Sequence, residues 1–360
     1  MSRAASIAEW VWHGSGIGPT MVRGALAPVG AIFAAAVARR NHRFDTGHGV
    51  EPVAIPALGV GNLSVGGTGK TPLAAWCARS LVEMGAKPAI VLRGYGDDEW
   101  RVHTLLNPGV PVVADADRVR GVASAAAQGA DCVVLDDAFQ HRRATRVAEL
   151  VLIAADSWTD RVRPLPTGPW REPLAALARA SAAVITVKAA STERVEQLQS
   201  AIKAAAPAVP IVIVGLVPGG LREVPTSGPM EHLNGAYEPL ETLRGRRIIV
   251  VSAIGDPTSF ERQLTALGAR VVPQRFGDHH AFSPSDVTRV LTSVDRDGMV
   301  VCTLKDAVKL APLWPRAAPP LWYVSQTIEV RLGWDVLHAA LTRVVSARNL
   351  PPAASPPIAG

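Results

Sequence analysis

The sequence contains a glycine-rich loop between an apolar strand and a helix, a combination that few folds use. Residues 61–71 read GNLSVGGTGKT, an apolar run at 53–60 precedes them, and a helical pattern at 72–83 follows. The glycines let the backbone approach a phosphate group and turn its N–H groups toward it. The positive end of the following helix adds to the attraction for anions. The segment therefore predicts a nucleotide-binding loop of the P-loop type.

The last two residues of this loop carry the expected chemistry. Lys70 would reach the β- and γ-phosphates, and the hydroxyl of Thr71 would bind Mg²⁺. Ser64 stands where the general pattern has its first glycine, so the match departs from that pattern at one position. A glycine-rich turn without a ligand is the alternative. The predicted nucleotide-binding residues are Ser64, Val65, Gly66, Gly67, Thr68, Gly69, Lys70 and Thr71.

Composition excludes several classes of protein. Of the 360 residues, 48% are hydrophobic and 19% are charged, which excludes a disordered chain. The 37 basic and 31 acidic residues leave a formal net charge of +6 without a long basic run, so no nucleic-acid partner is expected. The three cysteines are far apart, which argues against a disulfide scaffold or a zinc ribbon and favours a reducing cytoplasm. No unbroken apolar stretch approaches ~20 residues, so a polytopic membrane protein is excluded.

The first 50 residues differ from the rest of the chain. Residues 24–38 are apolar, and arginines follow them at once. Fifteen helical residues would span about 22 Å, which is short of the ~30 Å hydrocarbon core. We therefore expect a helix that lies in the membrane interface, anchored by the arginines; a helix docked on the protein is the alternative. One face of this helix would carry Val22, Leu26, Val29, Phe33 and Val37.

From about residue 52 onward, short apolar strands alternate with helices. This alternation predicts an α/β fold with a mostly parallel sheet flanked by helices, similar to that of P-loop NTPases. Prolines become dense at 206–218, where we expect a boundary. The predicted units are a membrane-associating segment at 1–50, a P-loop kinase domain at 51–210, a smaller α/β domain at 211–350 and a disordered tail at 351–360.

Two adjacent carboxylates follow a buried strand at 132–135. A P-loop needs an acidic residue at the end of a neighbouring strand to complete its Mg²⁺ site, and Asp136 and Asp137 are the candidates. Side chains alternate along a strand, so one carboxylate should face the metal and the other a loop or a helix. An ordinary strand end is the alternative.

Two further segments leave their interpretation open. An acidic turn, Asp97-Asp98-Glu99, follows the strand at 89–92, where a carboxylate would accept a proton from a substrate hydroxyl or simply be solvated. The segment FGDHHAF places Asp278 and His279 together after a strand in the second series. Metal binding is one reading of this cluster, and surface or core histidines are the other.

Six segments in order resemble the tetraacyldisaccharide 4'-kinases, the lipid A 4'-kinases of Gram-negative bacteria. They are GNLSVGGTGKTPL, VLRGYG, GADCVVLDDAFQHRR, PLPTGPWREPL, FGDHHAF and TLKDAVKL, and the resemblance runs from about residue 59 to 310. It implies transfer of the γ-phosphate of ATP, with Mg²⁺, to the 4' hydroxyl of a tetraacyldisaccharide 1-phosphate. Kinases of this family open the loop with Thr or Ser, which matches Ser64.

The resemblance also implies roles for individual residues. Asp98 matches the family's catalytic aspartate, with Asp97 in the place of a glycine, and His279 matches the histidine that pairs with it. Lys70 would be the third catalytic residue. Ala138 replaces the glycine of the D-D-G-[FL]-Q-H motif, and alanine would cost stability there if the position needs a positive φ. Candidates for substrate contact are Asn62, Arg93, Gln140, His141, Arg171 and Glu172.

The resemblance also implies a cellular location and binding partners. The protein would act at the cytoplasmic face of the inner membrane, on a lipid A precursor disaccharide, with no obligatory protein partner. A P-loop ATPase switch or partner-delivery protein is the alternative from another class, and a kinase of non-lipid small molecules is a third. The switch or delivery protein would need neither the pair Asp98 and His279 nor an amphipathic anchor.

Overall fold

The computed structural model describes most of the chain. The described residues are 3–94, 99–224, 236–277, 280–295 and 298–349. The predicted base Asp98, its neighbour Asp97, the pair Asp278 and His279, and the tail at 351–360 lie outside these ranges.

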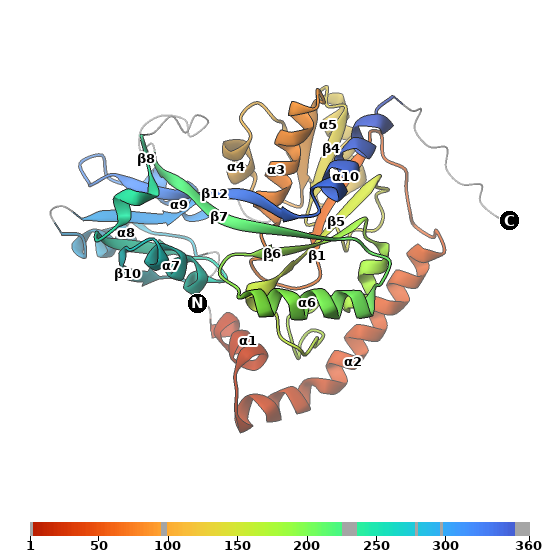
Figure 1. The fold of residues 1–360 in the computed structure, drawn as a ribbon, viewed down its shortest axis with the longest axis horizontal. Coiled ribbons are helices and arrows are strands. Elements are labelled where there is room, and N and C mark those ends of the chain that lie inside the picture. Colours follow the sequence, from red (N-terminus) through yellow and green to blue (C-terminus); the bar gives the residue numbers. More distant parts are fainter. Residues whose placement is uncertain (1–2, 95–98, 225–235, 278–279, 296–297, 350–360) are drawn as a thin grey trace.

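A continuous twelve-stranded sheet runs through the molecule (Figure 1). Its order is β10-β9-β11-β12-β7-β6-β5-β1-β4-β2-β3, and β8 pairs with β7 off this path. Every pairing is parallel except those of β7 with β12 and β8, which confirms the predicted mostly parallel α/β sheet. The strands are β1 Ala57–Asn62, β2 Pro88–Leu92, β3 Val112–Ala114, β4 Cys132–Asp136, β5 Ala148–Ala154, β6 Ala182–Val187, β7 Ile211–Glu223, β8 Tyr237–Glu238, β9 Arg247–Ser252, β10 Arg270–Arg275, β11 Met299–Thr303 and β12 Leu321–Leu332.

Helices cover both faces of the sheet because its strands are apolar on both sides. The part of the sheet that contains β1 to β6 is called the first unit. In it, α3 and α10 pack on one face, against residues such as Leu58 and Leu150. The opposite face, which carries Val133 and Val151, is covered by α5, η2 and α6. The helices are α1 Arg3–His13, α2 Ile17–Asp45, α3 Lys70–Glu83, α4 Glu99–Leu106, α5 Arg118–Ala127, α6 Thr192–Ala205, α7 Pro257–Ala266, α8 Pro284–Thr292, α9 Leu304–Leu310 and α10 Trp334–Ala347, with short 3₁₀ helices η1 Ala155–Ser157, η2 Leu174–Arg179, η3 Leu240–Leu243 and η4 Ala311–Leu313.

A second, smaller α/β unit is built on β9, β10, β11 and the first part of β12. Its two faces are covered by α8 and α9 on one side and by α7 on the other. The boundary predicted at residues 210 and 211 does not separate two sheets, because β7 pairs with β6 of the first unit and with β12. The helix α10 lies within the range predicted for the smaller domain, 211–350, but it packs into the core of the first unit, where Leu337 and Leu341 are buried.

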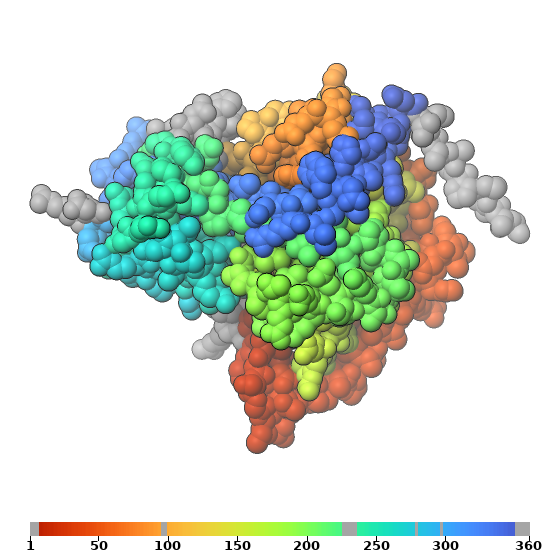
Figure 2. Space-filling view, in the orientation of Figure 1, coloured from red at the N-terminus to blue at the C-terminus, as the bar shows by residue number. Residues whose placement is uncertain are grey.

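The N-terminal helices lie along the outside of the first unit, and Figure 2 shows them at its margin. α2 has 29 residues, roughly 43 Å at 1.5 Å per residue, so the helix is far longer than its central apolar segment. Among the described residues it is the one helix with the length and composition to cross a membrane. The predicted apolar face turns mostly toward the protein, since Leu26, Phe33 and Val37 are part-buried. Apolar residues also cover the outer face, where Ile17 and Ile32 are 80% and 70% exposed.

Candidate active site

The phosphate loop lies where the sequence predicts it, between β1 and α3. Gly69 precedes the first residue of α3 and has a φ of 85°, a left-handed conformation that favours glycine. A Cβ at this position would lie 2.4 Å from Cδ1 of Leu216, so a larger residue would also have to displace that side chain. Within the described residues, the N–H groups of Gly66 and Gly67 have no hydrogen-bond acceptor. The loop therefore presents free donors at its exposed tip, as a phosphate cradle requires.

Asn62 braces the loop from beneath. Its side-chain amide donates to the carbonyl of Ser64 at 2.6 Å and to Oγ1 of Thr68 at 3.0 Å. The hydroxyl of Thr186 on β6 donates to the carbonyl of Thr68 at 2.9 Å. Asn62 is fully buried, which corrects its prediction as a substrate contact: it holds the loop in shape.

The two adjacent aspartates after β4 have different partners. Asp136 is buried, and its Oδ2 lies 2.9 Å from Nε2 of His103 on α4. Asp137 has a φ of 51° and points its carboxylate elsewhere: Oδ1 lies 3.6 Å from Nζ of Lys70 and 3.2 Å from Nη1 of Arg171. The two carboxylates thus have different partners, and which of them faces a metal stays a prediction. Both aspartates nonetheless line the same cavity as Thr71.

The positive φ in this segment belongs to Asp137, and Ala138 is not among the described residues with a positive φ. The strain expected if Ala138 had to adopt a positive φ is therefore absent. Ala138 is completely buried and its N–H donates to the carbonyl of Val60 at 3.1 Å. Alanine fits this position without a conformational penalty.

Asp136 is held in its charged form. Burial alone would raise its pKa, but the hydrogen bond with His103 and the charge of Lys70 outweigh burial, and the pKa lies below its ordinary value. A buried carboxylate that stays ionised beside the phosphate loop is the kind of group that binds a hard divalent cation.

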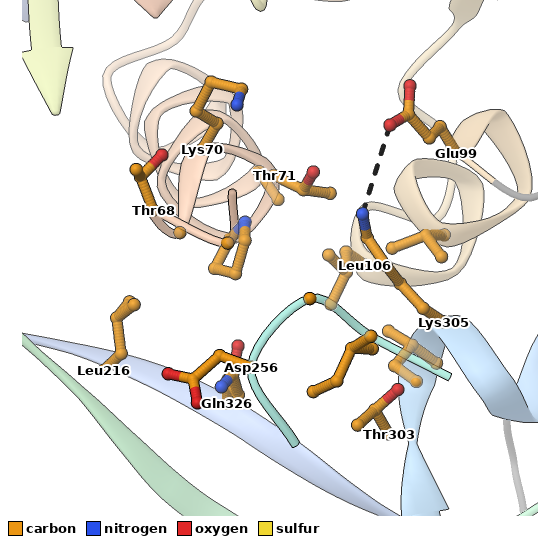
Figure 3. Close-up of a pocket in the computed structure, with 18 of the residues that line it drawn as sticks. Thr68, Lys70, Thr71, Glu99, Leu106, Leu216, Asp256, Thr303, Lys305 and Gln326 are labelled. Carbon is orange, nitrogen blue, oxygen red and sulfur yellow. Dashed lines mark ion pairs between the residues drawn. The ribbon is translucent and has the colours of Figure 1, made fainter. Parts of the chain in front are cut away.

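The loop opens into a cavity of about 880 Å³ between the two units. Figure 3 shows Thr68, Lys70 and Thr71 on one side and Asp256, Thr303 and Gln326 on the other. Two ion pairs span it: Nζ of Lys305 lies 4.0 Å from Oε1 of Glu99, and Nζ of Lys188 lies 4.0 Å from Oδ2 of Asp256. Side chains of both units therefore contribute to this site.

Some of the predicted site residues line this cavity and others do not. The residues from Val65 to Thr71 line it, as do Asp136, Asp137, Arg93 and Arg171. Ser64, Asn62, Gln140, His141 and Glu172 are absent from its lining. The backbone of Ser64 forms a β-bridge with that of Trp170.

Glu172 is a buried junction and not an exposed substrate contact. Its Oε2 accepts hydrogen bonds from Asn41 of α2 at 2.6 Å and from Arg179 of η2 at 2.9 Å. Gln140 donates to its Oε1 at 3.3 Å and to the carbonyl of Asn62 at 2.9 Å. This network joins the N-terminal helix to the segments that support the phosphate loop.

His141 is uncharged, and His280 has a structural partner. Burial and the nearby Arg118 and Arg93 lower the pKa of His141 to about 4, so this histidine is neutral at physiological pH. Nε2 of His280 lies 3.0 Å from Oδ2 of Asp286, within the capping box of α8. Within the part of the chain that the structure describes, no group of three or more His, Cys, Asp and Glu forms a metal cluster.

Sequence reasoning missed three residues at this site. Lys188 follows β6, lines the cavity, and donates from Nζ to the carbonyl of Gly67 at 3.3 Å. Arg118 is buried and donates to the carbonyl of Asp136 at 3.2 Å. His103 binds the carboxylate of the same aspartate. Lys188 directly follows a strand, and this position could have predicted a site residue. Arg118 and His103 lie on helices and belong to no motif.

The lysine of the phosphate loop and two acidic neighbours face a cleft between two α/β units. This arrangement defines the class of P-loop kinases. Comparison with known proteins identifies the family within this class. The family model for tetraacyldisaccharide-1-P 4'-kinase matches residues 22–109 and 102–346. The chain belongs to the tetraacyldisaccharide 4'-kinase family, as its motifs predict.

Individual relatives agree with this assignment. A tetraacyldisaccharide 4'-kinase of Anaeromyxobacter sp. (strain K) is 37% identical over 91% of this chain and 92% of its own. A protein of the same name from Alkalilimnicola ehrlichii is 34% identical over 90% of this chain and 94% of its own. In fold, the chain is similar to the crystal structure of LpxK from Aquifex aeolicus in complex with ATP, with a TM-score of 0.68 and 24% identity over 90% of this chain and 99% of that one.

Proposed function

We propose that this chain transfers the γ-phosphate of ATP to the 4' hydroxyl of a tetraacyldisaccharide 1-phosphate, a step of lipid A biosynthesis that yields lipid IVA. The observation that carries the proposal is that the phosphate loop and the adjacent acidic pair line one cavity, in a chain similar along its length to kinases of that name. The cavity is large enough for a nucleotide and a sugar together.

Lys70 and the loop N–H groups bind the phosphates and stabilise the charge that develops on the transferred group. Mg²⁺ would be held by the hydroxyl of Thr71 and by Asp136 or Asp137, which fits its preference for few carboxylates plus substrate phosphates. Bound there, the ion would neutralise charge on the β- and γ-phosphates. Arg171 lines the same cavity beside Asp137 and is placed to contact the nucleotide or the substrate.

Asp98 is the proposed general base, and His279 is the residue proposed to orient it. Both lie outside the described residues, but the residues that directly follow them, Glu99 and His280, line one cavity from opposite units. Asp98 would accept the proton of the 4' hydroxyl or orient that hydroxyl, and His279 would hydrogen-bond to the aspartate.

The N-terminal helices supply the proposed contact with the membrane. The outer face of α2 is apolar and open, while its inner face is tied to Glu172 near the site. This arrangement would hold the cavity at the membrane surface, where the acyl chains of the substrate need not leave the lipid. Because ATP is the donor, we place the protein at the cytoplasmic face of the inner membrane.

The proposal is tested with purified protein, Mg²⁺, ATP labelled at the γ-phosphate and the disaccharide 1-phosphate in detergent micelles. Label should appear in the lipid, and it should disappear when Lys70 is replaced by alanine. ATP hydrolysis that is unaffected by lipid, with no labelled lipid, would overturn the proposal in favour of an ATPase switch.

A further inference from the structure

A second cavity, of about 510 Å³, lies between the turn that joins α1 to α2 and the segment after β5. It shares no lining residue with the cavity of the phosphate loop. Half of its lining residues are arginines and tryptophans: Trp12, Arg23, Trp158, Arg161, Arg163 and Arg194.

The charges around this cavity are unbalanced. Asp156 and Asp160 are its acidic lining residues, and the carboxylate of Asp156 is already engaged by the N–H groups of Lys188 and Ala189, each at 2.8 Å. Arg23 and Arg194 donate to nearby carbonyl groups. Within the described ranges of the chain, the guanidinium groups of Arg161 and Arg163 have no hydrogen-bond or ion-pair partner.

The arginines also lie close enough to repel one another. Burial lowers the pKa of Arg163, and the charges of Arg23 and Arg161 lower it further. An anion in the cavity would relieve this repulsion.

A neutral donor in the same wall has no acceptor either. Trp158 is 7% exposed and lines the cavity, and its indole N–H has no acceptor among the described residues. This N–H is closed off from solvent, so the arginines, and not Trp158, are the groups that an anion in the cavity can reach. The unpartnered guanidinium groups of Arg161 and Arg163 indicate a site for an anion with several acceptor oxygens.

The surroundings indicate what that anion is attached to. The same two helices that form the cavity expose apolar side chains: Trp10 is 47% exposed, Ile17 80% and Met21 70%. A free inorganic anion would gain nothing from this apolar surface. A phosphate ester attached to acyl chains would contact both, because its headgroup is anionic and its tails are apolar.

We propose that this cavity binds the phosphate ester of a membrane lipid, either an anionic phospholipid of the bilayer or the 1-phosphate of the substrate. The inference rests on the membrane contact proposed for α1 and α2. The cavity also adjoins the support of the phosphate loop: the carbonyl of Arg163 accepts from the N–H of Trp170, and the neighbouring Pro169 accepts from Val65 of the loop. A lipid bound here would therefore fix the kinase at the surface by the segment that carries its active site.

The test compares Arg161→Gln/Arg163→Gln with a matched control, Arg316→Gln/Arg343→Gln, which removes two exposed arginines outside the cavity. Sedimentation is measured with vesicles of phosphatidylcholine alone and with vesicles that also contain phosphatidylglycerol. If the bilayer supplies the phosphate, the cavity variant should lose affinity for the anionic vesicles by about fivefold per arginine, and the control should not. Thermal unfolding of both variants checks that they fold.

The second arm uses non-ionic detergent micelles without phospholipid. If the substrate supplies the phosphate, the cavity variant should raise KM for the disaccharide 1-phosphate about tenfold, with kcat and KM for ATP unchanged. A cavity variant that matches the control in both arms overturns the inference while the kinase function stands. Wild-type protein that binds neither kind of vesicle and makes no labelled lipid would overturn the proposed function as well.

Discussion

Nε2 of His103 lies 2.9 Å from Oδ2 of Asp136, and both side chains are buried beneath the phosphate loop's cavity. The N–H of Asp137 donates to the other oxygen, Oδ1, at 2.8 Å. Both carboxylate oxygens are thus fixed by protein groups, and each keeps a lone pair. His103 contacts neither loop nor cavity directly, so its influence on the site passes through the direction in which Asp136 is held.

His103→Leu should weaken divalent-cation binding. Removing a hydrogen-bond partner of a metal-binding carboxylate typically costs about 10–100-fold in metal affinity or activity. We expect a higher Mg²⁺ requirement with KM for the lipid unchanged, and weaker Mn²⁺ binding by electron paramagnetic resonance. His103→Asn, whose amide can still donate, should recover part of the loss. Equal Mn²⁺ affinity in the leucine variant and the wild type would show that His103 has only a packing role.

Lys70→Ala should lower kcat by about 10²–10³ because a cation that stabilises the transferred phosphoryl group is lost. The fold should survive, since Lys70 lies at the start of α3 and supports no core cluster. Lys87→Ala removes an exposed lysine outside the cavity and serves as the control. A Lys70→Ala protein with near-normal lipid phosphorylation would contradict the P-loop assignment.

Gly69→Ala should abolish ATP binding, because the new Cβ would meet Leu216 and the residue would keep an unfavourable φ. Gly85→Ala is the matched control: Gly85 follows α3 at its other end with a φ of 78°, and a Cβ added there would have no neighbouring atom within 4 Å. It should cost stability by about 1 kcal/mol without changing ATP affinity. Calorimetric titration with ATP separates the two. Equal ATP affinity in both variants would show that Leu216 yields and the loop adapts.

Much of this architecture can be predicted from local pattern. Apolar periodicity and end signals place α8 and α10 at their observed bounds, because each helix has a proline or glycine entry and a regular buried stripe. The phosphate loop is predictable for the same reason: its glycines are required by backbone geometry that the sequence displays directly. Local pattern cannot say on which core a helix packs, so α10 is assigned to the wrong unit.

The parts of the site that escaped prediction depend on contacts between distant segments. β12 continues to Leu332 and pairs with β7, a strand far away in the sequence, and local pattern does not show this pairing. Asn62 and Glu172 look like surface polar residues until the fold buries them against Thr68 and Asn41. His103 resembles any histidine of an amphipathic helix. Only tertiary structure brings such a residue to the carboxylate that it serves.

Replacing the exposed apolar residues of α2 should separate anchoring from catalysis. Ile17→Ser/Met21→Ser/Ile32→Ser changes side chains that are 80%, 70% and 70% exposed, so the fold should be little affected. Turnover should fall in lipid vesicles and stay near normal in detergent micelles, because only the vesicle assay requires insertion into a bilayer. The same comparison is made with residues 1–50 deleted. Equal losses in both media would show that the helix is purely structural.

Asp306 should make the protein less stable as pH rises. It is buried at the start of α9, where it accepts hydrogen bonds from Thr303 and from the N–H of Ala253, and burial raises its pKa to about 6. Its pKa is thus higher in the folded protein than the unfolded value of 3.8. The contribution of protonated Asp306 to the free energy of unfolding is therefore fully present below pH 3.8 and is lost as pH rises through about 6.

Asp306→Asn removes this dependence, because its amide carries no charge at any of these pH values. Urea unfolding of both proteins at about pH 4.5 and about pH 7 measures it: across that interval the wild type should lose roughly 2 kcal/mol relative to the variant. The difference isolates Asp306, because every other titrating group is common to the two proteins. A constant difference between the two pH values would mean that Asp306 titrates in the folded protein as it does in the unfolded chain.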